Sequence, residues 1–490
     1  MSALLALVTM ATLVVWVVVQ LGSADAGPWD LDVHVVQTSA DLSQRLSRMP
    51  DRLLSGRPPH GVPVIDVDDG VRYQRIQGVG GAMTDSSAWL IRNQLDAATR
   101  SRLLNNLFGS SAAGLSFVRL PIAASDFTAT AKPYSYDDLP AGATDPHLSH
   151  FSIAHDDAYI VPAMRTVMQI NPSTSIIATP WSPPPWMKTN DSFENVGLKG
   201  HLLPGDWSVL ANYFVRFVQA YARRGIPIAA VAPQNEPRAP ANYPAMSFAA
   251  ANQAKWIAQD LRPALKAAQL PTKIYAGETS FSAPSYALSL AKVKQSGLDG
   301  ISQHCYRGAP SLLGQLHDAN PSLRLVVSEC ALQLTPYSAS EIAIGAMRNW
   351  ASAVGLWNLA LDPSGGPVEE PNTGCGGCKG IVTIDPQTQR VTYNLPYYQL
   401  GQIGRFVKPG AQRVDSNHFV SYYLGTGQGN YGTSQGVDDL AARNPDGTVV
   451  LVAYNNTTSD ARFAVRWRGR SFTYQLPAHA TVTFSWNHPA

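Results

Sequence analysis

Short apolar runs of β type recur between about residues 75 and 400, with helix-like stretches between them. Seven runs are clear: Ser116–Leu120, Ser175–Ala178, Ile228–Ala232, Lys273–Ala276, Gly300–His304, Arg324–Ser328 and Val354–Trp357. An eighth strand is expected near Gly78, and segments such as Ser208–Arg224 and Ser247–Ala268 have helical character. Eight strands that alternate with helices predict an α/β fold, a closed (β/α)₈ TIM barrel.

The helical pattern stops after Arg405. Alternating apolar residues at 449–453 and 472–476 then flank turn signals, which indicates antiparallel strands. Residues 30–65 alternate weakly and are interrupted by prolines, so they indicate short strands that form no domain alone. We therefore expect an appended antiparallel β-sandwich built from both ends of the chain. Residues 27–72 and 406–490 supply its strands, and residues 73–405 form the barrel.

The first 26 residues have the pattern of an export segment. The run from Ala3 to Val19 is apolar except for two threonines, and Ala24-Asp25-Ala26 is an A-x-A cleavage pattern. No Lys or Arg precedes the run, and its length approaches the roughly 20 residues that span a bilayer. A cleaved signal peptide is our first interpretation, and an uncleaved N-terminal membrane anchor is the alternative. Both predict a secreted or extracytoplasmic protein.

Charge and cysteine content exclude several classes of function. The chain has 37 basic and 35 acidic residues, a formal charge of +2, which argues against nucleic acid as a partner. Its 11 Trp and 19 Tyr suit a sugar-binding cleft. Cys375 and Cys378 form a CGGC motif without the second pair that a four-ligand zinc site needs, so a local disulfide or two inert thiols is favoured. We expect no metal and no organic cofactor.

Two glutamates follow predicted barrel strands. Glu236 ends the fourth, within Asn235-Glu236-Pro237, and Glu329 ends the seventh. Reactive groups of such barrels lie at the C-terminal ends of the strands, so both carboxylates should face the same rim. Two carboxylates across a cleft are the arrangement that cleaves glycosides. The alternative is that each glutamate is a solvated strand-end residue without a role in chemistry.

At this point the chain resembles glycoside hydrolase family 30, and within it the glucosylceramidase (acid β-glucosidase) branch. Beside the Asn-Glu-Pro motif, the resemblance rests on four further segments: Gln77–Asp85, Arg119–Pro121, Trp181–Asn190 and Trp357–Leu361. The likeness runs from about residue 72 to the C-terminus. It implies that Glu236 is the acid/base and Glu329 the nucleophile of a retaining mechanism.

The resemblance also implies residues that bind the substrate. Glu329 must stay ionised, and Arg119 and Tyr306 are candidate donors to it; an ion pair below the rim and aromatic packing are their respective alternatives. Asn235 should reach the sugar 2-hydroxyl, unless it caps a turn. Trp181 and Trp357 resemble the walls of the glycone subsite, unless they belong to the barrel core.

Three further positions have a possible role at the site. Asp85 resembles the aspartate that binds hydroxyls at the far side of the glycone, or it is the N-cap of a helix that starts near Ser86. His304 is either a proton shuttle or a core residue. Asn372 resembles a loop asparagine of the family, next to the segment that holds Cys375 and Cys378.

These features predict a retaining β-glycosidase that hydrolyses β-glucosides through a covalent glycosyl-enzyme intermediate, with glucosylceramidase-like specificity. The alternatives within the family are β-1,6-glucanase, xylanase and β-fucosidase or xylosidase activities. A catalytically silent carbohydrate-binding protein is the alternative from another class. The expected partner is a β-linked glycoside, with a glycolipid as one candidate. Contact with a membrane surface would come through the N-terminal segment or a lipid substrate.

Overall fold

The computed structural model describes residues 31–130, 132–293, 297–369, 375–416 and 436–487. Within these ranges no helix is both long enough and apolar enough to cross a membrane. The N-terminal apolar run and Asn372 lie outside the described residues.

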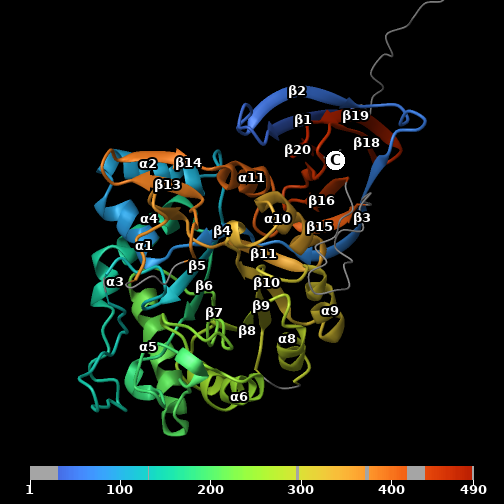
Figure 1. Cartoon of the computed structure of the whole chain (residues 1–490). Coiled ribbons are helices and arrows are strands. Elements are labelled where there is room, and N and C mark those ends of the chain that lie inside the picture. The colour runs from blue at the N-terminus through green and yellow to red at the C-terminus, as the bar shows by residue number, and fades with distance from the viewer. Residues whose placement is uncertain (1–30, 131, 294–296, 370–374, 417–435, 488–490) are drawn as a thin grey trace, which may run out of the picture.

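Eight parallel strands close into the predicted barrel, with helices around it (Figure 1). In chain order the strands are β4 (Gly78–Ala82), β5 (Phe117–Ile122), β6 (Ser175–Pro180), β7 (Ala230–Val231), β8 (Lys273–Ser280), β9 (Gly300–His304), β10 (Arg324–Glu329) and β11 (Ala351–Leu356). The barrel closes where β11 pairs with β4, Gly355 beside Gly80. Gly80 faces β5 so closely that a Cβ would lie 1.7 Å from the Phe117 carbonyl oxygen, so only glycine fits there.

The surrounding helices are α1 (Asp85–Asn93), α2 (Ala97–Phe108), α3 (Ala154–Ala158), α4 (Ile160–Ile170), α5 (Trp207–Arg223), α6 (Ala250–Trp256), α7 (Arg262–Ala267), α8 (Pro284–Ala291), α9 (Ser311–Ala319), α10 (Ala339–Arg348) and α11 (Leu395–Gly404). The helix expected over Ser247–Ala268 is instead α6, a π-helical turn at Ile257–Leu261, and α7. Pro263 in the first turn of α7 explains the change, because it has no N–H for a regular helical bond.

Nine strands from both ends of the chain form the second domain. Their order is β19 (Arg470–Leu476), β18 (Ala461–Trp467), β3 (Val64–Arg75), β15 (Gln412–Ser416), β16 (Val437–Arg443), β17 (Val449–Asn455), β20 (Thr481–Trp486), β1 (Leu31–Thr38) and β2 (Ser47–Leu54). A bridge between Ser55 and Ser471 brings the two edges of the sheet together around a separate apolar core. The expected sandwich from N- and C-terminal strands is therefore present.

Helices α10 and α11 lie between the barrel and this sheet (Figure 1). The Thr483 hydroxyl donates to the Gln402 main-chain carbonyl at 2.7 Å, and Arg348 pairs with Asp439 at 2.9 Å. A small sheet of β12 (Ala360–Leu361), β13 (Val382–Asp385) and β14 (Arg390–Tyr393), not expected from the sequence, follows the last barrel strand. The domains thus share a packed, hydrogen-bonded interface.

Candidate active site

The two predicted glutamates meet at the C-terminal rim of the barrel. Glu236 follows β7, the fourth barrel strand, and Glu329 ends β10, the seventh. One carboxylate oxygen of each lies within 4.8 Å of the other. Retaining glycosidases hold their carboxyl groups about 5–5.5 Å apart, whereas inverting enzymes need about 6.5–9.5 Å. The separation therefore fits the retaining geometry.

Glu329 is held by the two donors expected from the sequence. The Tyr306 hydroxyl donates to Oε1 at 2.5 Å, and the Arg119 guanidinium donates to Oε2. The Glu329 side chain is only 6% exposed, whereas that of Glu236 is 25% exposed. The cation and the hydroxyl thus hold both carboxylate oxygens of Glu329 in place. The more open Glu236 is accessible to the leaving group and to water.

Arg119 also joins the other predicted substrate residues. It donates to Asn235 Oδ1 at 2.7 Å, so Asn235 is held by the guanidinium. Its Cζ lies 4.5 Å from the Trp181 ring centre and 5.5 Å from that of Trp357. The two indoles stack 5.0 Å apart and are only 2% and 4% exposed. They belong to a small apolar cluster at the site, apart from the cluster of apolar side chains between the strands and the helices.

Glu278, at the end of β8, belongs to the same network and was missed by the sequence interpretation. Arg119 and His304 both contact its Oε2, and the Ser328 hydroxyl donates to Oε1 at 3.0 Å. Burial raises the pKa of Glu278, but Arg119, His304 and Ser302 together outweigh burial and lower it to about 2. Strand alternation did not identify Glu278, because β8 shifts register between Gly277 and Thr279.

His304 lies between three carboxylates. Its Nδ1 is 3.1 Å from Glu236 Oε1 and 3.4 Å from Glu329 Oε1, and its Nε2 is 3.1 Å from Glu278 Oε2. Burial lowers the pKa of His304, but the three carboxylates outweigh burial and raise it to about 10. His304 is therefore a fixed cation at neutral pH, which argues against the proton-shuttle alternative.

Asp85 is not the helix N-cap considered above. Thr84 caps α1 by accepting from the Ser87 N–H, and Asp85 is the first helical residue. Its buried carboxylate accepts from the Ala129 N–H and the Tyr159 hydroxyl, both at 2.7 Å, and lies 2.6 Å from His155 Nε2. These contacts fix the carboxylate in one position.

Asp85 is connected to the indole pair through Phe127. The carbonyl oxygen of Phe127 accepts the N–H of Ser86, the residue after Asp85, at 3.1 Å. The Phe127 ring packs edge-on against Trp357 at 5.8 Å. Asp85 therefore lies on the same side of the rim as the two tryptophans.

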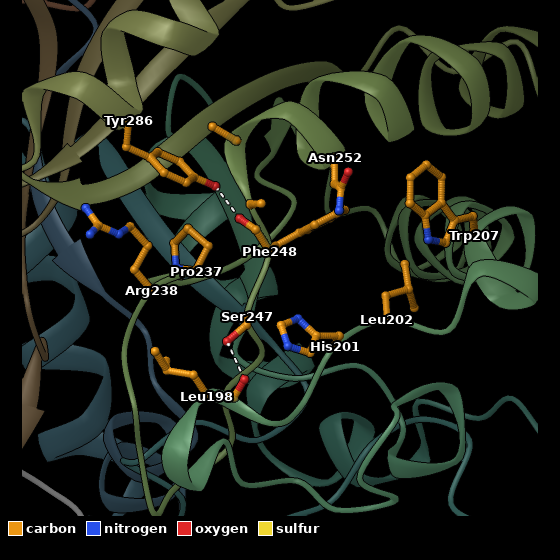
Figure 2. Close-up of a pocket in the computed structure, with 12 residues that line it drawn as sticks. Leu198, His201, Leu202, Trp207, Pro237, Arg238, Ser247, Phe248, Asn252 and Tyr286 are labelled. Carbon is orange, nitrogen blue, oxygen red and sulfur yellow. Dashed lines mark hydrogen bonds between the residues drawn. The ribbon is translucent and has the colours of Figure 1, made fainter.

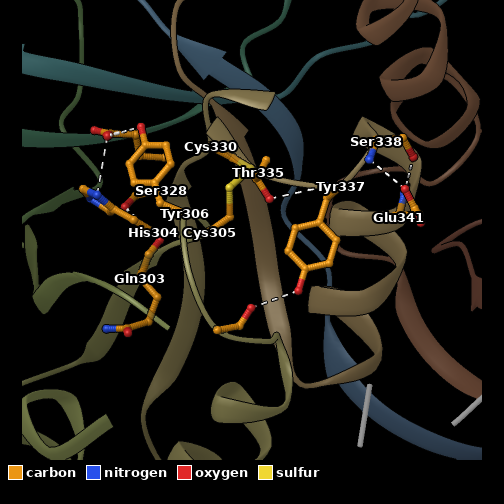
Figure 3. Close-up of a disulfide and its surroundings, with 12 residues drawn as sticks. Gln303, His304, Cys305, Tyr306, Ser328, Cys330, Thr335, Tyr337, Ser338 and Glu341 are labelled. Carbon is orange, nitrogen blue, oxygen red and sulfur yellow. Dashed lines mark hydrogen bonds and ion pairs between the residues drawn. A yellow bond between two sulfur atoms is a disulfide. The ribbon is translucent and has the colours of Figure 1, made fainter. Parts of the chain in front are cut away.

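A disulfide between Cys305 and Cys330 lies beside His304 and Tyr306 (Figure 3). Cys305 separates His304 from Tyr306, and Cys330 follows Glu329. The Cys305 N–H donates to the Glu329 carbonyl at 3.2 Å, and the Cys330 carbonyl accepts the Trp357 N–H at 2.9 Å. The bridge therefore links the ends of β9 and β10 at the residues that carry the site.

Cys375 and Cys378 form a second, local disulfide, which was one of the two alternatives considered for this motif. Cys378 is buried in the same apolar cluster as Trp181 and Trp357. The CGGC motif therefore lies beside the indoles at the rim.

Two pockets open beside Glu236, and Arg238 lines both. A pocket of 470 Å³ is lined by Glu236, Tyr306 and Arg307. A second pocket, of 510 Å³, lies between the start of α5, the start of α6 and α8 (Figure 2). Figure 2 shows Trp207, His201 and Asn252 around it, with Phe248 and Tyr286 on the side of Pro237. Space for a further part of a substrate therefore adjoins the glutamate pair.

Known proteins share both domains of this chain. Residues 76–407 match the glycosyl hydrolase family 30 TIM-barrel domain, and residues 410–484 match the family 30 β-sandwich domain. An endo-1,6-β-D-glucanase of Neurospora crassa is 34% identical over 84% of this chain and 88% of its own length. The lysosomal acid glucosylceramidase of Mus musculus is 28% identical over 85% of this chain and 82% of its own.

A solved endo-β1,6-glucanase superposes with a TM-score of 0.80 at 28% identity, covering 94% of this chain and 100% of its own. The catalytically silent alternative does not fit these relatives, which are named as hydrolases, or the intact glutamate pair. The chain belongs to glycosyl hydrolase family 30 and is a glycoside hydrolase.

Proposed function

We propose that the protein is a retaining endo-β-glucanase that hydrolyses β-1,6-linked glucan. The observation that carries this proposal is the 34% identity to an endo-1,6-β-D-glucanase over 84% of the chain. The sequence motifs alone favoured the glucosylceramidase branch, but the mouse relative of that name is less similar, at 28%. β-1,6-Glucanase, considered above as an alternative, is therefore the better supported specificity.

The proposed reaction has two steps. Glu329 attacks the anomeric carbon while Glu236 protonates the glycosidic oxygen, which leaves with the rest of the chain. Glu236 then takes a proton from water, and the water oxygen displaces Glu329 from the sugar with net retention of configuration. Arg119 and Tyr306 support this assignment because both donate to the Glu329 carboxylate.

The remaining residues would bind the glycone. Asn235, fixed by Arg119, is proposed to contact the 2-hydroxyl, and Asp85 the hydroxyls at the far side of the ring. Trp181 and Trp357 would present apolar ring surface to the sugar C–H bonds. Because their rings are only 2% and 4% exposed, we expect the contact to involve ring edges.

The pocket between α5, α6 and α8 would take the leaving part of the glucan. It shares Arg238 with the pocket at Glu236, and it combines the Trp207 ring with the polar side chains of His201 and Asn252. Aromatic surface beside directional hydrogen-bonding groups suits a sugar ring. An endo-acting enzyme needs such a site because its substrate continues on both sides of the cleaved bond.

A panel of substrates tests the proposal: β-1,6-glucan, β-1,3-glucan, xylan, aryl β-glucosides and glucosylceramide. We expect release of oligosaccharides from β-1,6-glucan, with the β-anomer formed first when products are followed by NMR. Preferred turnover of glucosylceramide would instead support the branch favoured by the sequence motifs. Turnover confined to xylan would exclude both the β-1,6-glucanase and the glucosylceramidase specificity.

We also propose that residues 1–26 direct export, as a cleaved signal or as an anchor. The two disulfides support this proposal, because such bonds persist in oxidising compartments. N-terminal sequencing of the mature protein distinguishes the alternatives: a cleaved chain begins at Gly27, whereas an anchored chain begins at residue 1 or 2.

A further inference from the structure

Three side chains with metal-binding chemistry gather in the segment that connects β5 to α3. One ligand atom each of Asp137, Asp145 and His150 lies within 4.8 Å of the other two. Metal ions bind such atoms at about 2.0–2.4 Å, so two ligand atoms of one ion lie at most about twice that distance apart. The three groups are therefore close enough to bind one ion. None of them takes part in the proposed hydrolysis.

Asp137 is buried and its carboxylate is unpaired. The residue is 1% exposed, and neither Oδ1 nor Oδ2 has a hydrogen-bond partner among the residues that the structure describes. Its neighbour Asp138, by contrast, accepts from the Ser135 hydroxyl at 2.6 Å and from the Ser135 N–H at 3.0 Å. A buried carboxylate without donors is costly, and such groups pair with a cation or bind a metal.

The backbone fixes Asp137 in this position. Its N–H donates to the Ser135 hydroxyl at 3.2 Å, and its carbonyl accepts the Trp186 indole N–H at 3.0 Å. Arg216 of α5 donates to the carbonyls of His147 and Leu148, at 2.9 and 2.8 Å. The guanidinium is thus engaged with main-chain oxygens of the stretch between Asp145 and His150.

The other two groups open the cluster to solvent. Asp145 Oδ2 accepts the His150 main-chain N–H at 2.8 Å and lies 2.9 Å from its Nδ1. The His150 side chain is 69% exposed, whereas that of Asp145 is 7% exposed. An ion can therefore enter from the side of His150 and reach the buried carboxylate.

We propose that Asp137, Asp145 and His150 bind one divalent transition-metal ion of the zinc–manganese class. Imidazole and carboxylate together suit Zn²⁺ or Mn²⁺, whereas Ca²⁺ and Mg²⁺ prefer oxygen ligands alone. Water completes the coordination on the exposed side. The ion has a structural role and takes no part in breaking the glycosidic bond.

The ion would stabilise a segment that supports Asp85. Tyr136, next to Asp137, donates to Asp156 at 2.6 Å, and Tyr134 donates to Asp85 at 3.4 Å and to Asp156 at 3.2 Å. The hydrogen bond from the Trp186 indole to the Asp137 carbonyl connects this segment to the motif that contains Trp181. Metal binding here links two segments of the rim that carry proposed substrate residues.

The test uses the full-length protein after removal of metals with a chelator. Zn²⁺ and Mn²⁺ are titrated separately by calorimetry, and thermal unfolding is followed with and without each ion. We expect the wild-type protein to bind one more equivalent of metal ion than the Asp137→Asn or Asp145→Asn variant. At a hundredfold excess over Kd, the wild-type Tm should rise by about 2–4 °C.

Two features keep the test decisive. Asp137→Asn removes an unpaired carboxylate, so the metal-free variant should be at least as stable as metal-free wild type, while its Tm no longer responds to metal. Asp138→Asn is the matched control and should keep the response. Equal binding by wild type and Asp137→Asn would overturn the proposal, and so would a Tm increase with Ca²⁺ but not with Zn²⁺ or Mn²⁺.

Discussion

His304 Nδ1 lies 3.1 Å from Glu236 Oε1, so a histidine that is protonated at neutral pH faces the candidate acid/base. The same imidazole reaches Glu278 through Nε2 at 3.1 Å. A fixed positive charge therefore lies beside the oxygen that would give a proton to the leaving group and later take one from water. The site thus depends on a buried group of charges as well as on the two glutamates.

The assigned roles predict different behaviour of two matched variants. Glu329→Gln should abolish turnover of every substrate, because no covalent intermediate forms. Glu236→Gln should lower kcat by about 10²–10⁴-fold on substrates with poor leaving groups. It should spare the first step with an activated aryl glucoside, and azide should restore release of the sugar. Identical kinetics of the two variants on the aryl glucoside would contradict the assignment.

Glu278→Gln should reduce kcat/KM by about 10–100-fold while the protein remains folded, because it removes the partner that orients both Arg119 and His304. Since Glu278 helps to raise the pKa of His304, its loss should lower that pKa. An NMR titration of the His304 imidazole should therefore show a lower midpoint than in the wild-type protein. Glu341→Gln, which changes a carboxylate in the capping box of α10, is the control and should leave that midpoint in place.

Stability should depend on pH at both extremes. His304 has a folded pKa of about 10 against an ordinary value of 6.5, so its contribution is fully present below about pH 6.5 and is lost as pH rises through 10. Glu278 has a pKa of about 2 against 4.5, so its contribution is present above about pH 4.5 and is lost as pH falls through 2. Denaturant unfolding across this range measures both effects. A free energy of unfolding that stays constant between pH 7 and 10 would contradict the predicted contribution of His304.

Replacing Cys305 and Cys330 together by serine should destabilise the protein and impair the site. The bridge closes a loop with a sequence separation of 25, which corresponds to about 3–4 kcal/mol in the chain-entropy account. Because both cysteines adjoin site residues, kcat per active site should also fall. Titration with a mechanism-based inactivator counts the active sites, and an unchanged kcat would assign the bridge to stability alone.

The Cys375–Cys378 bridge provides a thermodynamic comparison. Its sequence separation is only 3, so replacing both of its cysteines by serine should cost less stability than loss of the Cys305–Cys330 bridge. Thermal unfolding of the two double variants under the same conditions measures the difference.

Trp207→Ala should raise KM for long β-1,6-glucan about 3–10-fold, because stacking of a sugar ring on an indole contributes roughly 1 kcal/mol. A small aryl glucoside is too short to extend into the pocket and should respond less. Trp89→Ala, a change of a partly buried tryptophan on α1, controls for the general effect of losing an indole. An equal effect of Trp207→Ala on both substrates would argue against a role in binding the leaving chain.

The barrel was predictable because its strands are buried on both faces and therefore read as continuous apolar runs. The predicted strand Gly300–His304 matches β9 at both ends. Strand β2 falls within the stretch expected to form short strands, but the sequence did not indicate its bounds. It lies at the sheet edge, contains Pro50, and alternates mainly between exposed and half-buried residues. Its position depends on pairing with β1, which local sequence does not reveal.

The site was predictable in part for the same reason. Strand ends identify Glu236 and Glu329, but β8 shifts register between Gly277 and Thr279, so simple alternation does not indicate where Glu278 points. The Cys305–Cys330 pair joins residues that are distant in sequence but follow neighbouring strands. The motifs recognised in the sequence lie around the glutamate pair, whereas the pocket between α5, α6 and α8 was not identified from the sequence.

The placement of β1 between β20 and β2, and of β3 between β18 and β15, determines when the chain can fold during synthesis. These early strands emerge from the ribosome first, yet β20, which pairs with β1, and β18, which pairs with β3, are among the last residues made. Until then their edges remain unpaired and open to association with other chains. A chain that stops before β16 should therefore aggregate, even though its whole barrel has already been synthesised.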